Sequence, residues 1–170
     1  MDIQFKLNKK AVDIFNELIE LEYTASFTKI QLAVELLYLG YNHASQKFYD
    51  DAGEELGHAK TLTDFLVSRG HEAQSPEIKI KPIGIKDLKD AIKKSYELEI
   101  QVTQAYDEAI REMFGLDIMA FNSLQGMMGI QVGEIESARQ AYMTFEFLSV
   151  DDQRQMEAGY YSQPVPTTEG

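Results

Sequence analysis

The sequence predicts an all-α protein, a four-helix bundle with a long crossover between its second and third helices. Apolar residues recur every three or four positions through four long segments, which is the period of a helix that buries one face. Short turns separate the first segment from the second and the third from the fourth, so each pair forms a hairpin. Residues 71–85 join the hairpins, and their length suits an extended crossover along the bundle.

The first hairpin joins helices predicted at about residues 9–39 and 43–69. Asn8 is expected to cap the first helix, and Gly40 to end it. Asn42 is expected just before the second helix and Gly70 just after it. The turn is short, so the two helices are expected to lie antiparallel as neighbours.

The crossover and the second hairpin follow. Prolines and a glycine interrupt residues 71–85, and an extended chain of this length brings the third helix back to the end where the second began. The third and fourth helices are predicted at about residues 86–114 and 117–147, with Gly115 in the turn. Residues 1–148 are therefore expected to form one bundle domain.

Residues 149–170 form a polar C-terminal tail. Ser149, Asp151 and Asp152 suit the start of a short fifth helix that ends near Gly159. The prolines that follow, Pro164 and Pro166, predict a loose end.

Composition restricts the classes of partner and cofactor. The chain has 28 acidic and 16 basic residues and a net charge of -12, which argues against nucleic acid or an anionic membrane as the main partner. It contains no cysteine, so a bound metal must use Glu, Asp, His or Gln. Such oxygen-rich ligation favours iron or manganese over structural zinc.

The sequence also bears on location. Residues 1–10 are polar and lack the apolar core of a signal peptide, and no apolar run approaches the roughly 18 residues of a spanning helix. We therefore expect a cytoplasmic protein that does not enter a membrane.

Polar residues interrupt the apolar face of each predicted helix. Glu55 and His58 are three residues apart, so both project from one face and can bind one metal ion. Alone, a Glu-x-x-His pair more often marks a solvated helix surface. The other helices, however, carry Glu22, Glu99 and the pair formed by Gln131 and Glu134 on their inner faces.

Counting residues from each turn places these side chains at one level. Glu99 lies 16 residues before Gly115, and Gln131 lies 16 residues after it. At about 1.5 Å per helical residue, both are roughly 24 Å from that turn. The same count in the first hairpin places Glu22, Glu55 and His58 about 21 to 28 Å from their turn. All four helices therefore supply polar residues near mid-bundle, which is the plan of a di-metal carboxylate bundle.

Several blocks of sequence resemble ferritin, specifically the non-haem bacterial type within the ferritin-like di-iron superfamily. The resemblance covers roughly residues 8 to 147. It is carried by Leu21-Glu22-Tyr23, Glu54-Glu55-Leu56-Gly57-His58-Ala59, Tyr96-Glu97-Leu98-Glu99 and Phe121-Asn122-Ser123-Leu124-Gln125 leading to Gln131.

The resemblance implies roles for individual residues. Glu22, Glu55 and His58 would hold the first iron, and Glu99 and Gln131 would complete a ferroxidase centre in which Glu55 bridges two irons. Bacterioferritin and rubrerythrin-like proteins carry a second Glu-x-x-His pair where this chain has Gln131 and Glu134, so it is more similar to ferritin and no haem is expected.

Three departures from the family pattern affect these expectations. Ferritins commonly have a tyrosine seven residues after the first glutamate, and here that residue is Lys29; it either pairs with a carboxylate or extends toward solvent or another subunit. Glu54 and Glu134 suit a third, weaker iron site, but Ile130 and Gly133 stand where further carboxylates are expected. The tail lacks the apolar character of the fifth helix in large ferritin cages.

The function implied by the resemblance is a ferroxidase that oxidises Fe(II) with O2 or peroxide and stores ferric mineral. A homo-oligomer is expected, with 24 subunits if the chain assembles as the family does. One alternative is a di-iron or di-manganese oxidoreductase that acts on peroxide or a small substrate without storing iron. A second alternative is a metal-free helical bundle that mediates protein contacts.

Overall fold

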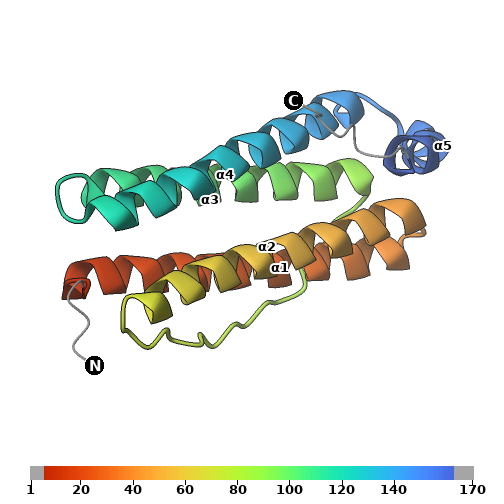
Figure 1. Cartoon of the computed structure of the whole chain (residues 1–170). Helices are drawn as coiled ribbons and strands as arrows, with labels where there is room; N and C mark the ends of the chain where they lie inside the picture. The colour runs from red at the N-terminus through yellow and green to blue at the C-terminus, as the bar shows by residue number, and fades with distance from the viewer. Residues whose placement is uncertain (1–5, 163–170) are drawn as a thin grey trace.

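The computed structural model describes residues 6–162, which contain five α-helices. Helices α1 (Lys9–Tyr38) and α2 (Asn42–Ser68) form one antiparallel hairpin, and α3 (Leu88–Met113) and α4 (Ile118–Phe145) form the other (Figure 1). Helix α5 (Val150–Tyr161) crosses one end of the bundle. The predicted all-α four-helix bundle with a short fifth helix is therefore confirmed, and α5 extends two residues beyond Gly159.

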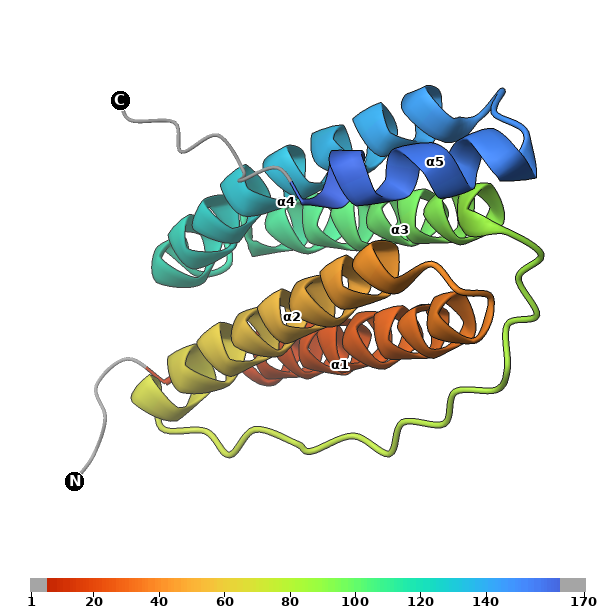
Figure 2. The same ribbon diagram turned by 90° about the vertical axis from the view of Figure 1, so that its right-hand side faces the viewer.

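The crossover between α2 and α3 runs back along the outside of the first hairpin (Figure 2). Its early part is held where the backbone N–H of Gln74 donates to Asn16 Oδ1 at 2.9 Å. Near its end, the backbone N–H groups of Ile83, Gly84 and Ile85 all donate to the Glu35 carboxylate, at 2.6–2.9 Å. These contacts return the chain to the end where α2 began, as its length predicted.

Side-chain acceptors begin two helices at predicted positions. Asn8 accepts a hydrogen bond from the Ala11 N–H at 2.9 Å, and Ser149 caps α5. Asn42 is the first residue of α2 and not the residue before it; Tyr41 precedes the helix, and its side chain makes no capping bond. Glu157 on α5 instead accepts from the N–H of Ala44, at 3.0 Å. A distant helix therefore supplies the acceptor that the start of α2 lacks.

Helices α1 and α2 approach each other closely at two serines. The buried Ser26 hydroxyl donates to the carbonyl of Ala52 at 2.7 Å, and the Ser45 hydroxyl donates to that of Ala33 at 2.8 Å. Small side chains at these four positions leave room for both bonds. These contacts lie in the central part of the hairpin and on its turn side.

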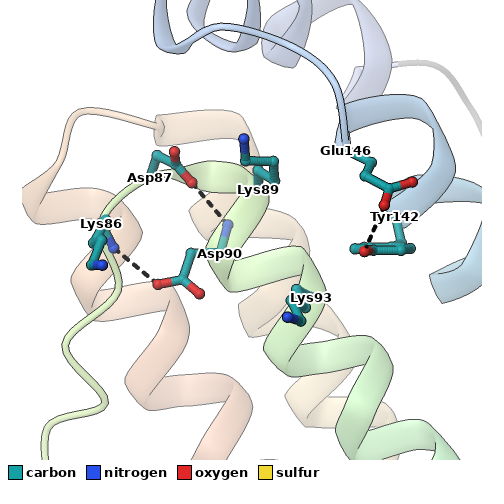
Figure 3. A pocket seen from close by; sticks show the side chains of 7 residues that line it. All are labelled: Lys86, Asp87, Lys89, Asp90, Lys93, Tyr142 and Glu146. Carbon is teal, nitrogen blue, oxygen red and sulfur yellow. Dashed lines mark hydrogen bonds between the residues drawn. The ribbon is translucent and has the colours of Figure 1, made fainter.

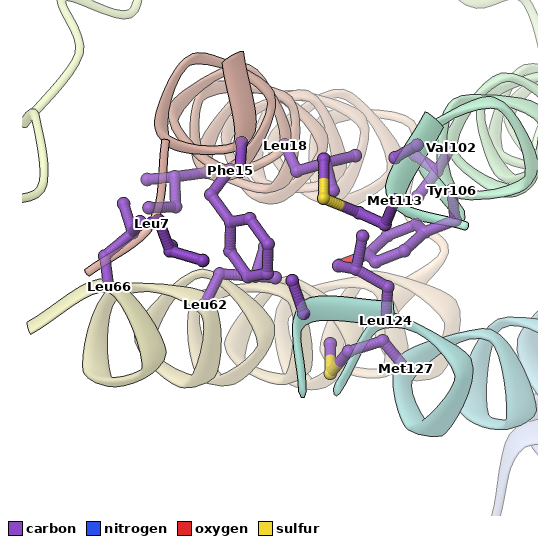
Figure 4. Packing of buried hydrophobic residues seen from close by; sticks show 14 of the residues in the cluster. Leu7, Phe15, Leu18, Leu62, Leu66, Val102, Tyr106, Met113, Leu124 and Met127 are labelled. Atoms are coloured by element: carbon purple, nitrogen blue, oxygen red, sulfur yellow. The ribbon is translucent and has the colours of Figure 1, made fainter. Parts of the chain in front are cut away.

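Two apolar clusters fill the ends of the bundle. The cluster at the free end of the first hairpin, seen in Figure 4, includes Phe15, Leu18, Leu62, Leu66, Met113 and Leu124. The cluster beside α5 includes Leu32, Leu36, Tyr41, Phe48, Ile92 and Phe145. The part of α1 that contains Glu22 and Lys29 runs between these clusters, so a polar layer separates two apolar ones.

The fifth helix is attached to the bundle by polar and aromatic contacts. Gln153 is buried; its Oε1 accepts from the Lys89 N–H and its Nε2 donates to the Leu148 carbonyl, both at 3.1 Å. The ring of Phe145 packs edge-on against Tyr160. Helix α5 therefore covers the starts of α2 and α3. Pro164 and Pro166 of the predicted loose end lie outside the described residues.

Among residues 6–162, no helix is both long enough and apolar enough to span a membrane.

Candidate metal centre

Six of the seven residues singled out from the sequence come together in the polar layer. They reach it from all four long helices, and all but Glu134 are buried. The six are Glu22 from α1, Glu55 and His58 from α2, Glu99 from α3, and Gln131 and Glu134 from α4. Glu54 is exposed on α2 and belongs to neither of the two groups of candidate ligands described next.

Glu22, Glu55 and His58 form the first group of candidate ligands. One ligand atom from each lies within 4.8 Å of the others. His58 Nδ1 is 3.0 Å from Glu55 Oε2 and 3.7 Å from Glu22 Oε2. The three-residue spacing of Glu55 and His58 produces this contact, as the helical period requires.

Glu55, Glu99 and Glu134 form the second group, with the same 4.8 Å limit between their ligand atoms. Gln131 is adjacent, because its Nε2 donates to Glu134 Oε2 at 2.8 Å. His58 Nε2 lies 3.5 Å from Glu134 Oε1. Glu55 belongs to both groups, so the two candidate positions share one carboxylate.

Lys29 projects into the second group. Its Nζ contacts Glu55 Oε1 and lies 2.6 Å from Glu99 Oε1. Only 4% of the residue is exposed. The sequence left two roles open for Lys29. The structure supports pairing with carboxylates, and the alternative prediction, that the side chain extends into solvent, is wrong.

The ionisation of Glu22 and His58 reflects burial and mutual contact. Burial raises the pKa of the Glu22 carboxyl to about 7, although contacts with His58 and Tyr106 oppose the shift. Burial alone would lower the pKa of His58, but the neighbouring Glu22 and Glu55 carboxylates outweigh it and raise that pKa to about 10. In the absence of a metal ion, His58 is therefore protonated at neutral pH.

The other carboxyl groups differ from one another. Burial opposes ionisation of Glu55, but His58 and Lys29 overcome it and lower the Glu55 pKa to about 2. Burial raises the pKa of Glu99 despite the opposing effect of Lys29. Burial also raises the pKa of Glu134, to about 7. For Lys29, burial favours the neutral amine, yet Glu99 and Glu55 raise its pKa and keep it charged.

Three buried oxygens of this layer find no hydrogen-bond partner among residues 6–162: Glu22 Oε2, Glu99 Oε2 and Gln131 Oε1. A buried polar atom without a partner is costly unless a water or an ion satisfies it. Carboxylate and amide oxygens with one imidazole are donors that suit Fe(II) or Mn(II). The layer can therefore hold divalent metal, and an ion bound to these three oxygens would replace the hydrogen bonds that they lack.

Tyr106 is a site residue that the sequence analysis did not single out. Its hydroxyl donates to Glu22 Oε1 and is fully buried. Tyr106 lies seven residues after Glu99, two helical turns along one face, and this spacing is the signal that could have identified it. By fixing one oxygen of Glu22, the hydroxyl leaves the other facing His58.

An open hollow with a volume of about 350 Å³ lies elsewhere, between the start of α3 and the end of α4 (Figure 3). It is lined by Lys86, Asp87, Lys89, Asp90, Lys93, Tyr142 and Glu146. Its acidic groups are already engaged: Asp87 and Asp90 accept backbone hydrogen bonds at the start of α3, and Glu146 accepts from Tyr142. The candidate metal centre is therefore the enclosed layer and not this surface feature.

Comparison with known proteins agrees with the geometry. Residues 12–146 match the family model of the ferritin-like domain. The chain is 28% identical over 120 residues to a probable bacterial non-heme ferritin-like protein of Haemophilus influenzae, covering 70% of this chain and 73% of that protein. It is equally identical, over the same length, to the bacterial non-heme ferritin of Campylobacter jejuni, covering 72% of that protein.

Solved structures show the same fold. An open pore ferritin from the hyperthermophilic archaeon Archaeoglobus fulgidus superposes with a TM-score of 0.87 at 22% identity, covering 94% of this chain and all of that one. A humanized archaeal ferritin gives the same TM-score and identity over 98% of its length. The family model, which spans most of the chain, and the two bacterial relatives confirm the resemblance to non-haem bacterial ferritins: the chain belongs to the ferritin family.

Proposed function

We propose that this protein is an iron-storage ferritin whose polar layer is a ferroxidase centre, oxidising Fe(II) with O2 or peroxide before ferric mineral is stored. The observation that carries the proposal is the set of three buried, unpartnered oxygens at the convergence of four carboxylates and a histidine. The names of the relatives, a ferritin and a ferritin-like protein, support it.

Fe(II) is the substrate, and the two groups of candidate ligands define where it would bind. Glu22, Glu55 and His58 would hold one ion, and Glu99, Gln131 and Glu134 would complete a second position that shares Glu55. His58 must release its proton before its nitrogen can bind a metal, so uptake of Fe(II) is expected to release protons.

The charge of the layer favours the oxidised product. Each Fe(II) gives up one electron, and O2 takes two electrons and two protons to become hydrogen peroxide. Carboxylates stabilise Fe(III) more than Fe(II), because its charge is higher and the buried layer screens charge weakly. Tyr106 holds Glu22 through its hydroxyl and so positions one ligand before the ion arrives.

Storage requires several subunits, and we propose a homo-oligomer, a 24-subunit cage if assembly follows the family. Large apolar side chains on the surface of the single chain support subunit contacts, notably Tyr38, which is 91% exposed, and Phe147, which is 88% exposed. The net charge of -12 suits attraction of Fe(II) and does not suit nucleic acid or anionic membranes. A cytoplasmic location is part of the same proposal.

The second candidate is a di-iron or di-manganese oxidoreductase that acts on peroxide or a small substrate and stores no mineral. Lys29 favours it, because a lysine beside the carboxylates departs from the family pattern at the centre itself. A metal-free interaction bundle is the weakest alternative, since it leaves the three buried oxygens unsatisfied.

The test is anaerobic loading of the apoprotein with Fe(II), followed by admission of air while ultraviolet absorbance and size-exclusion elution are recorded. The wild type is compared with the double variant Glu55→Ala, His58→Ala. Glu54→Ala is the matched control, because Glu54 is adjacent in sequence but exposed.

The ferritin proposal predicts fast oxidation by the wild type and the control, slow oxidation by the double variant, and many irons retained in a large particle. Fast oxidation with about two irons or fewer retained per chain would instead identify the oxidoreductase. Equal rates in the wild type and the double variant would exclude the polar layer as the oxidation site.

A further inference from the structure

We propose that Lys29 is a built-in counter-cation that fills the Glu55–Glu99 half of the polar layer, so that each wild-type chain binds one divalent ion tightly instead of two. The ion would lie at Glu22, Glu55 and His58. The inference rests on the proposed ferroxidase centre and changes how many ions it holds tightly: the second Fe(II) that the two-electron reduction of O2 requires would bind only weakly, at Glu99, Gln131 and Glu134.

The position of the ammonium group is the first argument. Lys29 Nζ contacts Glu55 Oε1 and lies 2.6 Å from Glu99 Oε1, so it bridges two carboxylates that belong to the second group of candidate ligands. Lys29 is two helical turns beyond Glu22 on the same face of α1, which directs it into the layer. A second metal ion in this group would have to share these two carboxylates with the ammonium group.

The two oxygens of the Glu55 carboxylate have different partners. Its Oε2 lies 3.0 Å from His58 Nδ1, whereas its Oε1 contacts Lys29. The carboxylate that would bridge two ions therefore already bridges the histidine side of the layer and an ammonium group. Only the oxygen facing His58 is available to a metal without moving Lys29.

Charge is the third argument. Glu22, Glu55, Glu99 and Glu134 supply four negative charges when all are ionised, and two divalent ions would neutralise them. Lys29 reduces that total to three, so one divalent ion leaves a single negative charge and two ions leave a single positive one. A second ion would also displace the buried ammonium from both of its partners, which is costly in a weakly screened interior.

Removing the ammonium should open the second position. Glu99 Oε2 and Gln131 Oε1 are buried and have no hydrogen-bond partner among the described residues, so they are available to an ion once Lys29 no longer neutralises their neighbours. Loss of the lysine charge is therefore expected to increase the number of bound ions.

The experiment counts Co(II) bound by the assembled apoprotein, using anaerobic calorimetric titration together with the visible spectrum of the bound ion. Co(II) is used because it is not oxidised under these conditions, so the count does not depend on turnover. The wild type is compared with Lys29→Met and with Lys29→Gln, which keeps a polar group. Lys47→Met is the matched control, since Lys47 pairs with Asp51 at the edge of the bundle.

We expect one tightly bound Co(II) per chain in the wild type and in Lys47→Met, and two in both Lys29 variants. His58→Ala should remove the wild-type ion, which assigns it to the first group and separates it from surface binding. Circular dichroism and size exclusion show whether each variant is folded and assembled.

Two tight ions per wild-type chain would overturn the inference while leaving the ferroxidase centre in place, and this count does not depend on any variant folding. One ion in the folded Lys29 variants would overturn it as well. Absence of a His58-dependent ion from wild type and variants alike would instead contradict the metal centre itself, and the inference with it.

Discussion

The apolar clusters at the ends of the bundle and the polar layer between them are both largely buried, yet they contribute to the protein in opposite ways. At the ends, side chains such as Phe15 and Leu36 gain free energy by leaving water. In the layer, Glu22 and Glu99 carry oxygens that lose water and gain no hydrogen bond. The ends therefore stabilise the fold, and the layer reduces its stability to keep ligand atoms available.

The largest expected effect tests the apolar side of this comparison. Phe15→Ala should reduce the free energy of unfolding by about 3–5 kcal/mol, because Phe15 is fully buried and stacks on Phe65 with ring centroids 4.7 Å apart. Denaturant unfolding of the apoprotein measures it. Well below the unfolding temperature, the rate of Fe(II) oxidation should stay near that of the wild type. A loss below about 1 kcal/mol would show that the end cluster is not what holds the bundle.

Glu22→Gln tests the polar side and should have the opposite sign. Burial raises the pKa of Glu22 from 4.5 to about 7. Below about pH 4.5 the carboxyl is protonated in both states and the folded state is not penalised; as the pH rises through 7 the buried carboxyl ionises and the protein loses stability. The amide avoids that loss and still accepts from Tyr106. The variant apoprotein should therefore be roughly 1–3 kcal/mol more stable than the wild type at pH 8 and no more stable at pH 4.

The same substitution should weaken metal binding, which a parallel Co(II) titration measures. If the variant were less stable than the wild type at pH 8, the layer would not be costly in the way proposed.

His58 gives the comparison a second pH dependence. Its pKa rises from 6.5 to about 10 through contact with Glu22 and Glu55, against the effect of burial, so its stabilising charge is full below about pH 6.5 and is lost as the pH rises through 10. The wild-type apoprotein should lose about 1–2 kcal/mol more than His58→Gln between pH 6.5 and 10. Parallel curves for the two proteins would contradict a charged His58.

The sequence was sufficient to predict the fold because most helix ends follow local rules. Helix ends predicted from Asn8, Gly40, Gly70 and Gly115 lie within one or two residues of those observed, and the three glycines adopt the left-handed φ values of 76–87° that end helices. Counting along straight helices also placed the polar residues at one level, because axial rise is nearly constant.

Side-chain contacts between helices could not be predicted from these local rules. The bond from Tyr106 to Glu22 depends on how α3 faces α1, and the bridging position of Lys29 depends on its rotamer. Glu157 could not be assigned to the start of α2, because nothing local to either helix encodes the docking of α5. Glu54 shows the converse: it is adjacent to Glu55 in sequence but lies on the exposed face.

Outside the layer, a buried or half-buried polar group can stabilise the fold. A substitution of Glu35 tests this, and its expected effect on stability is smaller than that of Phe15→Ala. Its carboxylate accepts from three consecutive backbone N–H groups at the end of the crossover. Glu35→Ala should cost about 1–2 kcal/mol, because those donors lose a charged acceptor. Limited proteolysis should also cut residues 71–85 faster. Unchanged stability together with unchanged cleavage would show that the crossover is held elsewhere.

The smallest effect is expected at the surface. Lys9 lies 2.5 Å from Asp13, with both side chains more than half exposed. Lys9→Ala should change the free energy of unfolding by about 0.5 kcal/mol or less, because solvent and salt screen the pair. Thermal unfolding at low and high salt measures this. A larger effect would mean that the difference between buried and exposed charge has been overstated.

The docking of α5 also bears on the order in which the molecule forms during synthesis. Its contacts join residues far apart in the chain, Glu157 with Ala44 and Arg154 with the carbonyl of Leu39. All residues of the first hairpin have been synthesised once residue 68 has left the ribosome, but the start of α2 receives its acceptor only when nearly the whole chain has emerged. This end of the subunit can therefore close only after α5 has been synthesised. A chain that stops earlier leaves the Ala44 amide without its acceptor and exposed to water.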